Sequence, residues 1–421
     1  MNTKRILKEA VRLSMEPVLK VYLDSLSGTE FDAEKVNRIL VFAYHGLGNF
    51  IMYTPALRLL RERYPNARID LQVGNNTGCE DVLEGAGLFD NIYNLPYSAG
   101  LGAWLDRARH IHDARYDLTI SEFHSHSWPL TLLIAASGAP FRLGHVTSPG
   151  WSRRFSRYCF VFNLPVTMRE DEHEIDRYMD LVAAAGAQTI AARDAAPFIY
   201  LGEEDRAFAR RFLRNGSETG GGTCAKTTIG FQPGTSPAMR WKQWPIERYR
   251  EVIRRVTLEH PDSHIVLFGS AIEEAMIQEM ARGLKGRISL AAGKTSVKQV
   301  AALIEQCDLL VCNDSGLMHT AVAVGTPVIA IYGPTDIRRT APLGERNLVI
   351  RHELPCSPCF KLEGDDQVHA CSHHDCLMTI TPDEVFHSIS CRPSGSAGVY
   401  NNEGPAVQRA PTDNSERQGH A

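Results

Sequence analysis

The sequence has no long apolar run, no strong net charge and no regular cysteine pattern. No apolar run approaches the roughly 18 residues of a membrane span, and the basic N-terminus lacks the apolar core and cleavage site of a signal peptide. The net charge of −4 offers nucleic acid no electrostatic attraction. The ten cysteines are scattered apart from one late cluster, unlike a secreted disulfide framework. We therefore expect a cytoplasmic protein that binds no nucleic acid.

The composition is that of an ordinary globular protein with two domains. The chain has 421 residues, too many for one compact core, with 43% hydrophobic and 22% charged residues. Short apolar runs alternate with segments of helical periodicity, which is typical of an α/β fold with parallel, doubly wound sheets. The runs expected to form strands include 39–44, 68–73, 90–95 and 117–120 in the first half and 227–232, 264–269, 308–312 and 327–334 in the second.

A glycine-rich stretch separates the two halves. Residues 215–226 have linker composition, and such flexibility would let the halves close on a substrate. We expect an amphipathic helix within residues 1–35, a first Rossmann-like domain over 36–214 and a second over 227–391. The polar tail, 392–421, has little apolar content and should be disordered.

One stretch, 311–321, is a candidate ligand site because of its position at a strand-to-helix turn. A buried strand is expected to end just before Asp314, Ser315 and Gly316, and a helix to begin there. Ligands of open α/β sheets bind outside the carboxyl ends of the strands, and the amides of a helix start attract phosphate. Ser315 adds a hydroxyl, and Gly316 allows close approach to the backbone. The alternative for this triplet is an ordinary helix N-cap.

Three motifs in order resemble the donor-site signature of glycosyltransferase family 9, the heptosyltransferase-like group. They are the residues 314–321, 325–327 and 332–335, and the resemblance extends over roughly Arg38 to Ile389. It implies a GT-B fold, in which two Rossmann-like domains face a central cleft. It also implies inverting transfer of a sugar from a nucleotide-diphosphate donor, such as ADP-heptose, to a lipopolysaccharide-type or other lipid-linked saccharide.

The resemblance also assigns donor-binding residues in the second half. Lys242 matches a lysine that contacts the donor diphosphate, and Thr235 and Ser236 match the small hydroxyl residues beside it. Glu273 is expected to accept hydrogen bonds from ribose hydroxyls or from an amino group of the base, although acids in the first turn of a helix are common without a ligand. His319 either contacts phosphate or packs within its helix.

The loop at residues 45–49 belongs to the acceptor side in the resembled family. Its two glycines, Gly46 and Gly48, lack the third glycine of a dinucleotide fingerprint, so a nicotinamide cofactor is not expected. A catalytic Asp often follows the last glycine in the family. Here that position is Asn49, and an amide cannot take a proton.

Other side chains near this loop are able to move protons. His45 is close in sequence and of a type that titrates near neutrality, but it is equally suited to a structural hydrogen bond. Glu122, His124 and His126 follow another strand end and are further candidates for the base or for acceptor contacts. Ordinary solvated loop polarity is their alternative.

The sequence contains no Asp-x-Asp triplet, the motif with which metal-dependent transferases commonly hold a divalent ion. Lys242, the hydroxyls of Thr235 and Ser315 and the helix start supply positive groups instead. These can stabilise the charge that develops on the departing diphosphate. We expect that catalysis requires no cofactor.

The late cysteine cluster contains Cys356-x2-Cys359 and Cys371-x4-Cys376. Two such pairs in a cytoplasmic chain can hold a structural zinc ion. The second pair has a spacing of four rather than two, and free or redox-linked thiols are the alternative.

The N-terminal segment 3–26 is predicted to be a basic amphipathic helix. Apolar residues recur at spacings of three and four among Lys4, Arg5, Lys8 and Arg12. The helix either packs on the protein or makes peripheral contact with an anionic membrane surface.

Three functions fit these features. The first is the inverting transferase. The second is a sugar-nucleotide 2-epimerase of the same architecture, although the order of its motifs is not found. The third is a binding protein that kept the nucleotide pocket but lost its base, which Asn49 makes worth testing.

Overall fold

The structure is a computed structural model that describes residues 3–28, 30–74, 78–147, 158–169, 171–215, 226–360, 371 and 373–391, without the side chains of residues 3–12 and His124. Contacts divide the chain into two compact units, the first over Met1–Ala191 and the second over Ala192–Lys361 with the described residues that follow. Nearly all of the predicted linker and the whole predicted tail lie outside the described residues.

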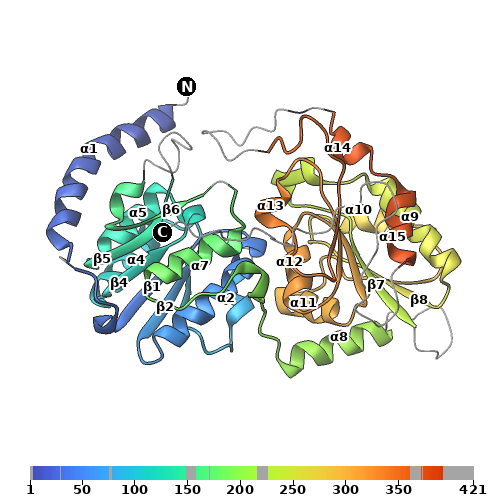
Figure 1. The fold of residues 1–421 in the computed structure, drawn as a ribbon, viewed down its shortest axis with the longest axis horizontal. Helices are drawn as coiled ribbons and strands as arrows, with labels where there is room; N and C mark the ends of the chain where they lie inside the picture. The colour runs from blue at the N-terminus through green and yellow to red at the C-terminus, as the bar shows by residue number, and fades with distance from the viewer. Residues whose placement is uncertain are drawn as a thin grey trace, which may run out of the picture. The chain divides into compact units, whose positions relative to one another are not determined.

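The first unit is built on a parallel six-stranded sheet with the order β3-β2-β1-β4-β5-β6 (Figure 1). The order reverses between β1 and β4, because the chain winds outward from β1 to β3 and then returns to the other side of β1. Such a reversal is the usual ligand position of an open sheet. The strands are β1 (Arg38–Ala43), β2 (Arg68–Val73), β3 (Asn91–Asn94), β4 (Leu118–Ser121), β5 (Phe141–Thr147) and β6 (Leu164–Met168).

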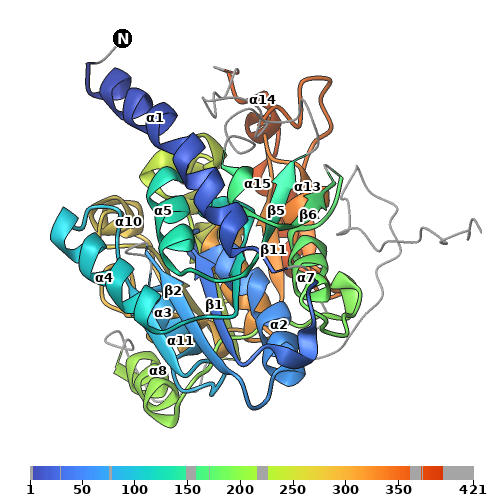
Figure 2. The same cartoon turned by 90° about the vertical axis from the view of Figure 1, so that its left-hand side faces the viewer.

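Helices cover both faces of this sheet. Figure 2 shows α2 and α7 on one side and α4 and α5 on the other, and α3 contacts α2. Because both faces are covered, β1 is buried along nearly its whole length, as its continuous apolar sequence predicts. The helices are α1 (Thr3–Leu26), α2 (Leu47–Arg63), α3 (Cys79–Leu83), α4 (Leu101–Asp113), α5 (Trp128–Ala136) and α7 (Glu174–Ala184), with short 3-10 turns at Ala33–Lys35, Phe123–Ser125 and Cys159–Val161.

Helix α1 has one packed face and one exposed face. Leu23 is buried in the core of the first unit, Leu19 packs against the same core, and a guanidinium nitrogen of Arg142 donates to the Leu23 carbonyl at 3.1 Å. Val18 and Val21 on another face are each 72% exposed. Figure 2 shows the N-terminal part of α1 projecting away from α5. Within the described residues, no helix is both long and apolar enough to cross a membrane.

The second unit repeats the plan with the sheet order β12-β11-β10-β7-β8-β9, again parallel throughout. Here the order reverses between β10 and β7, which pair from Leu309 and Ile229 to Cys312 and Gln232. The strands are β7 (Thr227–Gln232), β8 (Ser263–Leu267), β9 (Arg287–Leu290), β10 (Leu309–Asn313), β11 (Val328–Ile331) and β12 (Leu348–Ile350).

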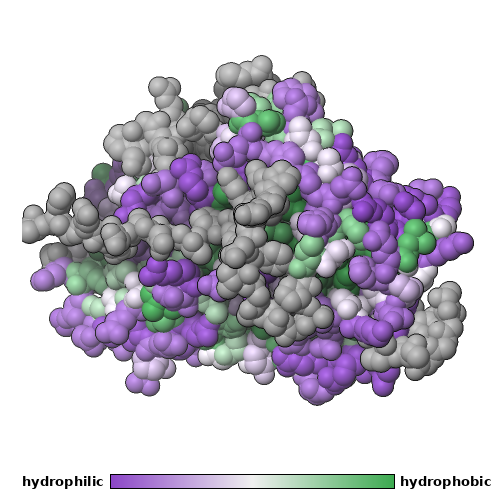
Figure 3. Space-filling view, turned by 45° about the vertical axis from the view of Figure 1, so that its right-hand side comes forward, coloured by the Kyte–Doolittle hydropathy of each residue, from purple (hydrophilic) through white to green (hydrophobic). Residues whose placement is uncertain are grey.

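The helices of the second unit also lie on both faces of its sheet (Figure 1). Apolar side chains from α9, α10 and α15 join the core on one face. The outer face seen in Figure 3 is mostly hydrophilic, with small separate apolar areas. The helices are α8 (Glu203–Asn215), α9 (Ile246–Glu259), α10 (Glu274–Ala281), α11 (Val297–Glu305), α12 (Gly316–Ala323), α13 (Ile337–Thr340), α14 (Asp375–Met378) and α15 (Pro382–Ser390), with 3-10 turns at Ala192–Asp194 and Pro237–Lys242.

Helix α8 belongs to the second unit, whereas the sequence analysis placed it in the first domain. It packs on α11, and Arg206 Nε lies 2.9 Å from Glu305 Oε2. The division by contacts therefore falls at Ala191 and Ala192, ahead of the glycine-rich stretch.

Candidate functional site

The motif of residues 313–316 lies at the carboxyl end of β10, where the strand order of the second unit reverses. β10 ends at Asn313, Ser315 takes an extended conformation as the N-cap, and α12 begins at Gly316. Gln232 ends the adjacent parallel strand, β7, at the same edge. The amides of α12 therefore start at the position where open α/β sheets bind ligands.

Asn313 holds the neighbouring loop in place. Its side-chain amide donates to the carbonyls of Pro233 and Gly234, both at 3.1 Å. Its oxygen accepts from the Trp244 amide and the Tyr249 hydroxyl, both at 3.0 Å. Asn313 is fully buried, so these bonds also satisfy an otherwise costly polar group. Asn313 was not predicted as a site residue. The signal in the sequence that could have identified it is a polar side chain at the end of an apolar strand.

Lys242 and Asp314 form the central ion pair of the site. Lys242 Nζ lies 2.7 Å from Asp314 Oδ2, and the side chains are 18% and 6% exposed. Burial raises the pKa of Asp314, but the Lys242 ammonium, the nearby Thr335 hydroxyl and His319 together lower it below its usual value. The carboxylate therefore stays ionised and keeps the ammonium at the start of α12.

The predicted hydroxyl residues surround this pair in part. Ser315 Oγ donates to Gln232 Oε1 at 2.8 Å, and the Gln232 amide donates in turn to the Gly234 carbonyl. Thr235 is buried and its hydroxyl donates to the Met239 carbonyl at 3.2 Å. Ser236 is exposed at the start of the 3-10 turn that carries Lys242. The hydroxyls of Ser315 and Thr235 are thus oriented by the protein.

Glu273 lies against the same loop. Its Oε2 accepts from the amide of Ser270 at 2.8 Å and from its hydroxyl at 2.7 Å. Its Oε1 is buried and has no hydrogen-bond partner among the described residues. A Cβ on Gly234 would lie 1.7 Å from Oε1, so a larger residue there would displace the Glu273 carboxylate. The carboxylate oxygen is therefore available beside the loop at Gly234.

An aromatic pair flanks Lys242. The rings of Trp241 and Phe360 lie 4.7 Å apart, and Lys242 Nζ lies 5.5 Å and 5.9 Å from their centroids. Such rings favour a cation at this distance. Neither aromatic residue was predicted, because nothing in the sequence links Phe360 to the turn at Trp241.

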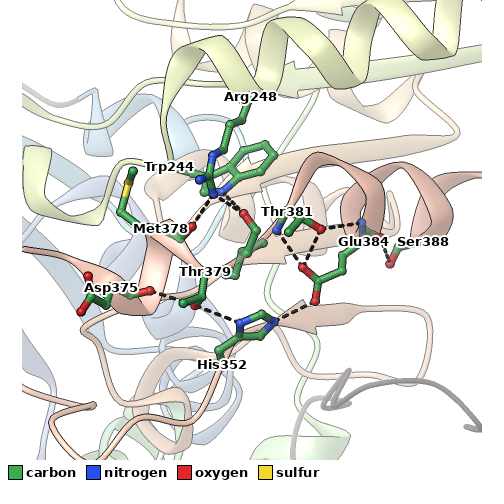
Figure 4. Close-up of polar contacts among 10 residues, drawn as sticks. Trp244, Arg248, His352, Asp375, Met378, Thr379, Thr381, Glu384 and Ser388 are labelled. Atoms are coloured by element: carbon green, nitrogen blue, oxygen red, sulfur yellow. Dashed lines mark hydrogen bonds and ion pairs between the residues drawn. The ribbon is translucent and has the colours of Figure 1, made fainter.

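A hydrogen-bond network fixes the base of the Lys242 turn (Figure 4). Trp244 Nε1 donates to the Ile380 carbonyl at 3.1 Å, and an Arg248 nitrogen donates to the Met378 carbonyl at 2.7 Å. His352 then bridges the Thr379 hydroxyl at 2.9 Å and Glu384 Oε1 at 2.7 Å. The residues that follow β12 are thereby tied to α14, α15 and the Lys242 turn.

His319 lies on α12 and is 7% exposed. It lowers the pKa of Asp314, which places it near the ion pair. Four of the predicted donor residues lie with the Glu273 carboxylate around the loop at 233–236. They are Thr235, Lys242, Asp314 and Ser315.

The predicted acceptor-side residues gather where the strand order of the first unit reverses. His45 follows β1, and Glu122 follows β4. His45 Nε2 lies 3.8 Å from Glu122 Oε1, which also accepts from the Ser125 hydroxyl. His45 is only 3% exposed and Glu122 is fully buried.

Two stacked phenols complete this buried cluster. The rings of Tyr53 and Tyr178 lie 4.4 Å apart, and their hydroxyls have no hydrogen-bond partner among the described residues. Burial raises the pKa of both phenols, and the Glu122 charge raises it further. Burial lowers the pKa of the nearby His145 to about 4, so this imidazole stays neutral.

The remaining predicted residues differ in accessibility. Gly46 is the N-cap of α2 and is exposed, while Gly48 and Asn49 in the first turn are partly exposed. His126 is 9% exposed and packs on Phe162. The side chain of His124 lies outside the described residues.

The four cysteines proposed as zinc ligands do not form a metal site among the described residues. Burial, together with thiolate charge on Cys359, Cys371 and Cys356, raises the pKa of Cys376 to about 11. The thiols are therefore near one another, yet no group of three or more Cys, His, Asp or Glu in the described ranges could hold a metal ion. The zinc hypothesis gains no support from these residues.

Comparisons with known proteins agree on one family. The profile of glycosyltransferase family 9 (heptosyltransferase) matches residues 108–367. Lipooligosaccharide heptosyltransferase 2 of Haemophilus influenzae is 28% identical over 363 residues, 84% of this chain and 98% of that protein. Lipopolysaccharide heptosyltransferase 2 of Escherichia coli is 27% identical over 367 residues, 84% of this chain and 97% of that protein.

A solved structure is similar over the same span. The ADP-heptose lipopolysaccharide heptosyltransferase II of Escherichia coli has a TM-score of 0.64 and 25% identity, and the match covers 84% of this chain and 97% of that one. The two doubly wound parallel sheets and this likeness confirm the predicted GT-B fold class.

Proposed function

The chain belongs to glycosyltransferase family 9, and on that premise we propose that it transfers a heptose or related sugar from an ADP-sugar to a hydroxyl of a lipopolysaccharide-type acceptor. The observation that carries this proposal is the Lys242–Asp314 pair at 2.7 Å, placed where α12 begins. An ammonium beside free helix amides is a suitable site for a diphosphate.

The second unit binds the donor. Lys242 and the first amides of α12 contact the diphosphate, and Glu273 Oε1 accepts a hydrogen bond from a ribose hydroxyl. During transfer the bond between the anomeric carbon and the diphosphate oxygen breaks, and its electron pair leaves with the nucleotide. Lys242 stabilises that charge in place of a divalent ion. A single displacement by the acceptor hydroxyl inverts the anomeric centre.

The first unit removes the proton of the attacking hydroxyl. Asn49 cannot do so, since a side-chain amide does not accept a proton near neutral pH. His45 serves as the base, and the buried Glu122 carboxylate 3.8 Å from Nε2 stabilises the imidazolium that forms. Because the ring is only 3% exposed, the hydroxyl enters beside Gly46, where a Cβ would meet nothing within 4 Å.

Helix α1 brings the protein to a lipid-linked acceptor. Its exposed apolar face, which includes Val18 and Val21, inserts at the surface of an anionic membrane while basic residues of the same helix contact head groups. The protein is then cytoplasmic and peripheral on the inner face of the membrane.

A donor panel tests the function. Thermal melting is measured with ADP, UDP, CDP and ADP-heptose, because a ligand that binds only the folded protein raises the melting temperature. We expect ADP and ADP-heptose to raise it and Lys242→Ala to reduce the shift. Absence of a shift with any nucleotide would contradict donor binding. Transfer of the sugar to a heptose-deficient lipopolysaccharide is measured in parallel. A rise in melting temperature without such transfer would favour a binding protein that lost its base, the alternative suggested by Asn49.

A further inference from the structure

A cavity outside the donor residues lies at the carboxyl ends of β11 and β12 in the second unit. Its volume is about 630 Å³. One side is formed by the start of α13 (Asp336, Ile337, Arg338), and the other by Arg351 and the loop that follows it. This volume falls in the range of small-molecule sites and exceeds what an inorganic anion fills.

Arg351 gives the cavity a buried cationic donor. The residue is 7% exposed, and its Nε has no hydrogen-bond partner among the described residues. A buried guanidinium donor that lacks a partner is costly, so an oxyanion placed beside it would be stabilised.

The acidic residues that line the cavity do not neutralise the positive charge of Arg351. Asp336 accepts from Arg338 Nε at 3.0 Å and 3.1 Å and from the Arg338 amide at 3.0 Å. Burial raises the pKa of Asp336, but these bonds to Arg338 lower it below its usual value. Glu353 is exposed at the rim, where solvent screens its charge.

The other lining residues suit a saccharide that carries the anion. Ile337, Leu354, Pro355 and Pro358 provide apolar surface for a sugar ring. The cavity also adjoins the donor residues, because Asp336 directly follows Thr335, whose hydroxyl lies beside Asp314.

We propose that this cavity binds an oxyanion, a phosphate or a carboxylate, carried by the saccharide acceptor, with Arg351 as its principal contact. The acceptor assignment rests on the proposed function, whereas anion binding at Arg351 does not. Arginine suits this task because its planar donors match both oxyanions.

Binding of glucose 6-phosphate, glucuronate and neutral glucose is measured by calorimetry with the donor site saturated by ADP. We expect the two anions to bind more tightly than glucose. Arg351→Gln should weaken anion binding roughly tenfold, the order of one charge-assisted hydrogen bond, while ADP affinity is unchanged. Arg351→Lys should restore part of the loss. Anion affinity is also measured for Lys242→Ala without ADP. An anion that binds at the donor residues instead should lose affinity in this variant.

Unchanged anion affinity in Arg351→Gln, or no preference for anions over glucose in the natural protein, would overturn the proposal. If Arg351→Gln does not fold, Arg351→Lys decides, since without the planar donors of arginine it should bind anions more weakly than the natural protein, and an unchanged affinity counts against the site. Arg351-dependent anion binding without ADP binding would remove the transferase proposal and leave the anion site.

Discussion

In the proposed mechanism, donor activation depends most on Lys242. Asp314 fixes the position of its ammonium, and the amides of α12 are expected to bind the same diphosphate. Positive groups that are already in place need no reorganisation when charge develops on the leaving diphosphate.

Replacing Lys242 by Ala should lower turnover by roughly a hundredfold or more, since loss of one such donor costs about 3 kcal/mol in the transition state. Steady-state rates with saturating acceptor measure the effect. Lys226→Ala is the matched control, because that lysine is in the same unit and is 81% exposed. A Lys242→Ala enzyme with near-normal turnover would exclude this role.

His45→Gln should lower turnover about a hundredfold, the lower end of the effect of a general base, and remove the acidic limb of the rate–pH profile. Glu122→Gln should lower turnover less and keep that limb, because its carboxylate acts through the imidazole. Both variants should bind ADP normally. Retention of the acidic limb in His45→Gln would identify another base.

At the scale of single residues, positions in recognisable motifs were predictable from the sequence, whereas positions defined by long-range contacts were not. Asp314 and Ser315 were predicted from their position at a strand end, and Lys242 was predicted from the resemblance to family 9. Asn313, one residue earlier, was missed, since its four hydrogen bonds join segments that are distant in sequence. The burial of His45 and Glu122 was equally hidden, because it arises from the packing of Tyr53 and Tyr178 around them.

At the scale of elements, α1 has two adjacent apolar faces, of which one is packed. Met15, Val18 and Tyr22 recur at the predicted spacings and are 43%, 72% and 40% exposed, whereas Leu19 and Leu23 face the core. Periodicity predicted the helix correctly but could not say which of two adjacent apolar faces would be covered.

Val18→Asp combined with Val21→Asp should reduce binding to vesicles that contain phosphatidylglycerol, because the exposed apolar face no longer enters the head-group region. Cosedimentation measures bound protein. Leu258→Asp on α9 is the control, since Leu258 is also an exposed apolar residue at 59%. Equal binding of all three proteins would contradict membrane contact through α1.

The start of α15 has a capping box that also anchors His352. Thr381 Oγ1 accepts from the Glu384 amide at 3.3 Å, and Glu384 Oε2 accepts from the Thr381 amide at 2.7 Å. Burial raises the pKa of Glu384, but the Thr381 amide and His352 lower it more, so the net shift is downward. A carboxyl group with a lowered folded pKa stabilises the fold above its unfolded pKa, and this contribution is lost as the pH falls through the folded value.

Glu384→Gln should therefore lower the free energy of unfolding by about 1 kcal/mol near neutral pH, and the difference should shrink as the solution is acidified. Urea denaturation at several pH values measures both effects. Glu279→Gln is the control, since its ion pair with Arg282 is exposed. A difference that grows on acidification would contradict the sign of the shift.

At the scale of the whole molecule, the alternation of strands and helices was sufficient to predict two parallel sheets. The division between them was not predictable from composition. Glycine content pointed to residues 215–226, but the apolar side of α8 packs on α11, and contacts rather than flexibility decide where a unit begins.

Transfer by the whole enzyme should continue at an unchanged rate in excess EDTA, because Lys242 and helix amides take the place of a divalent ion at the diphosphate. Product formation with and without chelator measures this. Activity that is lost in EDTA and restored by magnesium would contradict the mechanism.

The hydrogen bonds of Asn313 affect how the donor site can change during evolution. The loop at 233–234, beside the proposed diphosphate site, is anchored by a side chain from the strand behind it through hydrogen bonds that do not involve Ser270 or Glu273. In the proposed donor site, substitutions at those two positions can therefore change the contact with the ribose while the loop at 233–234 keeps its position.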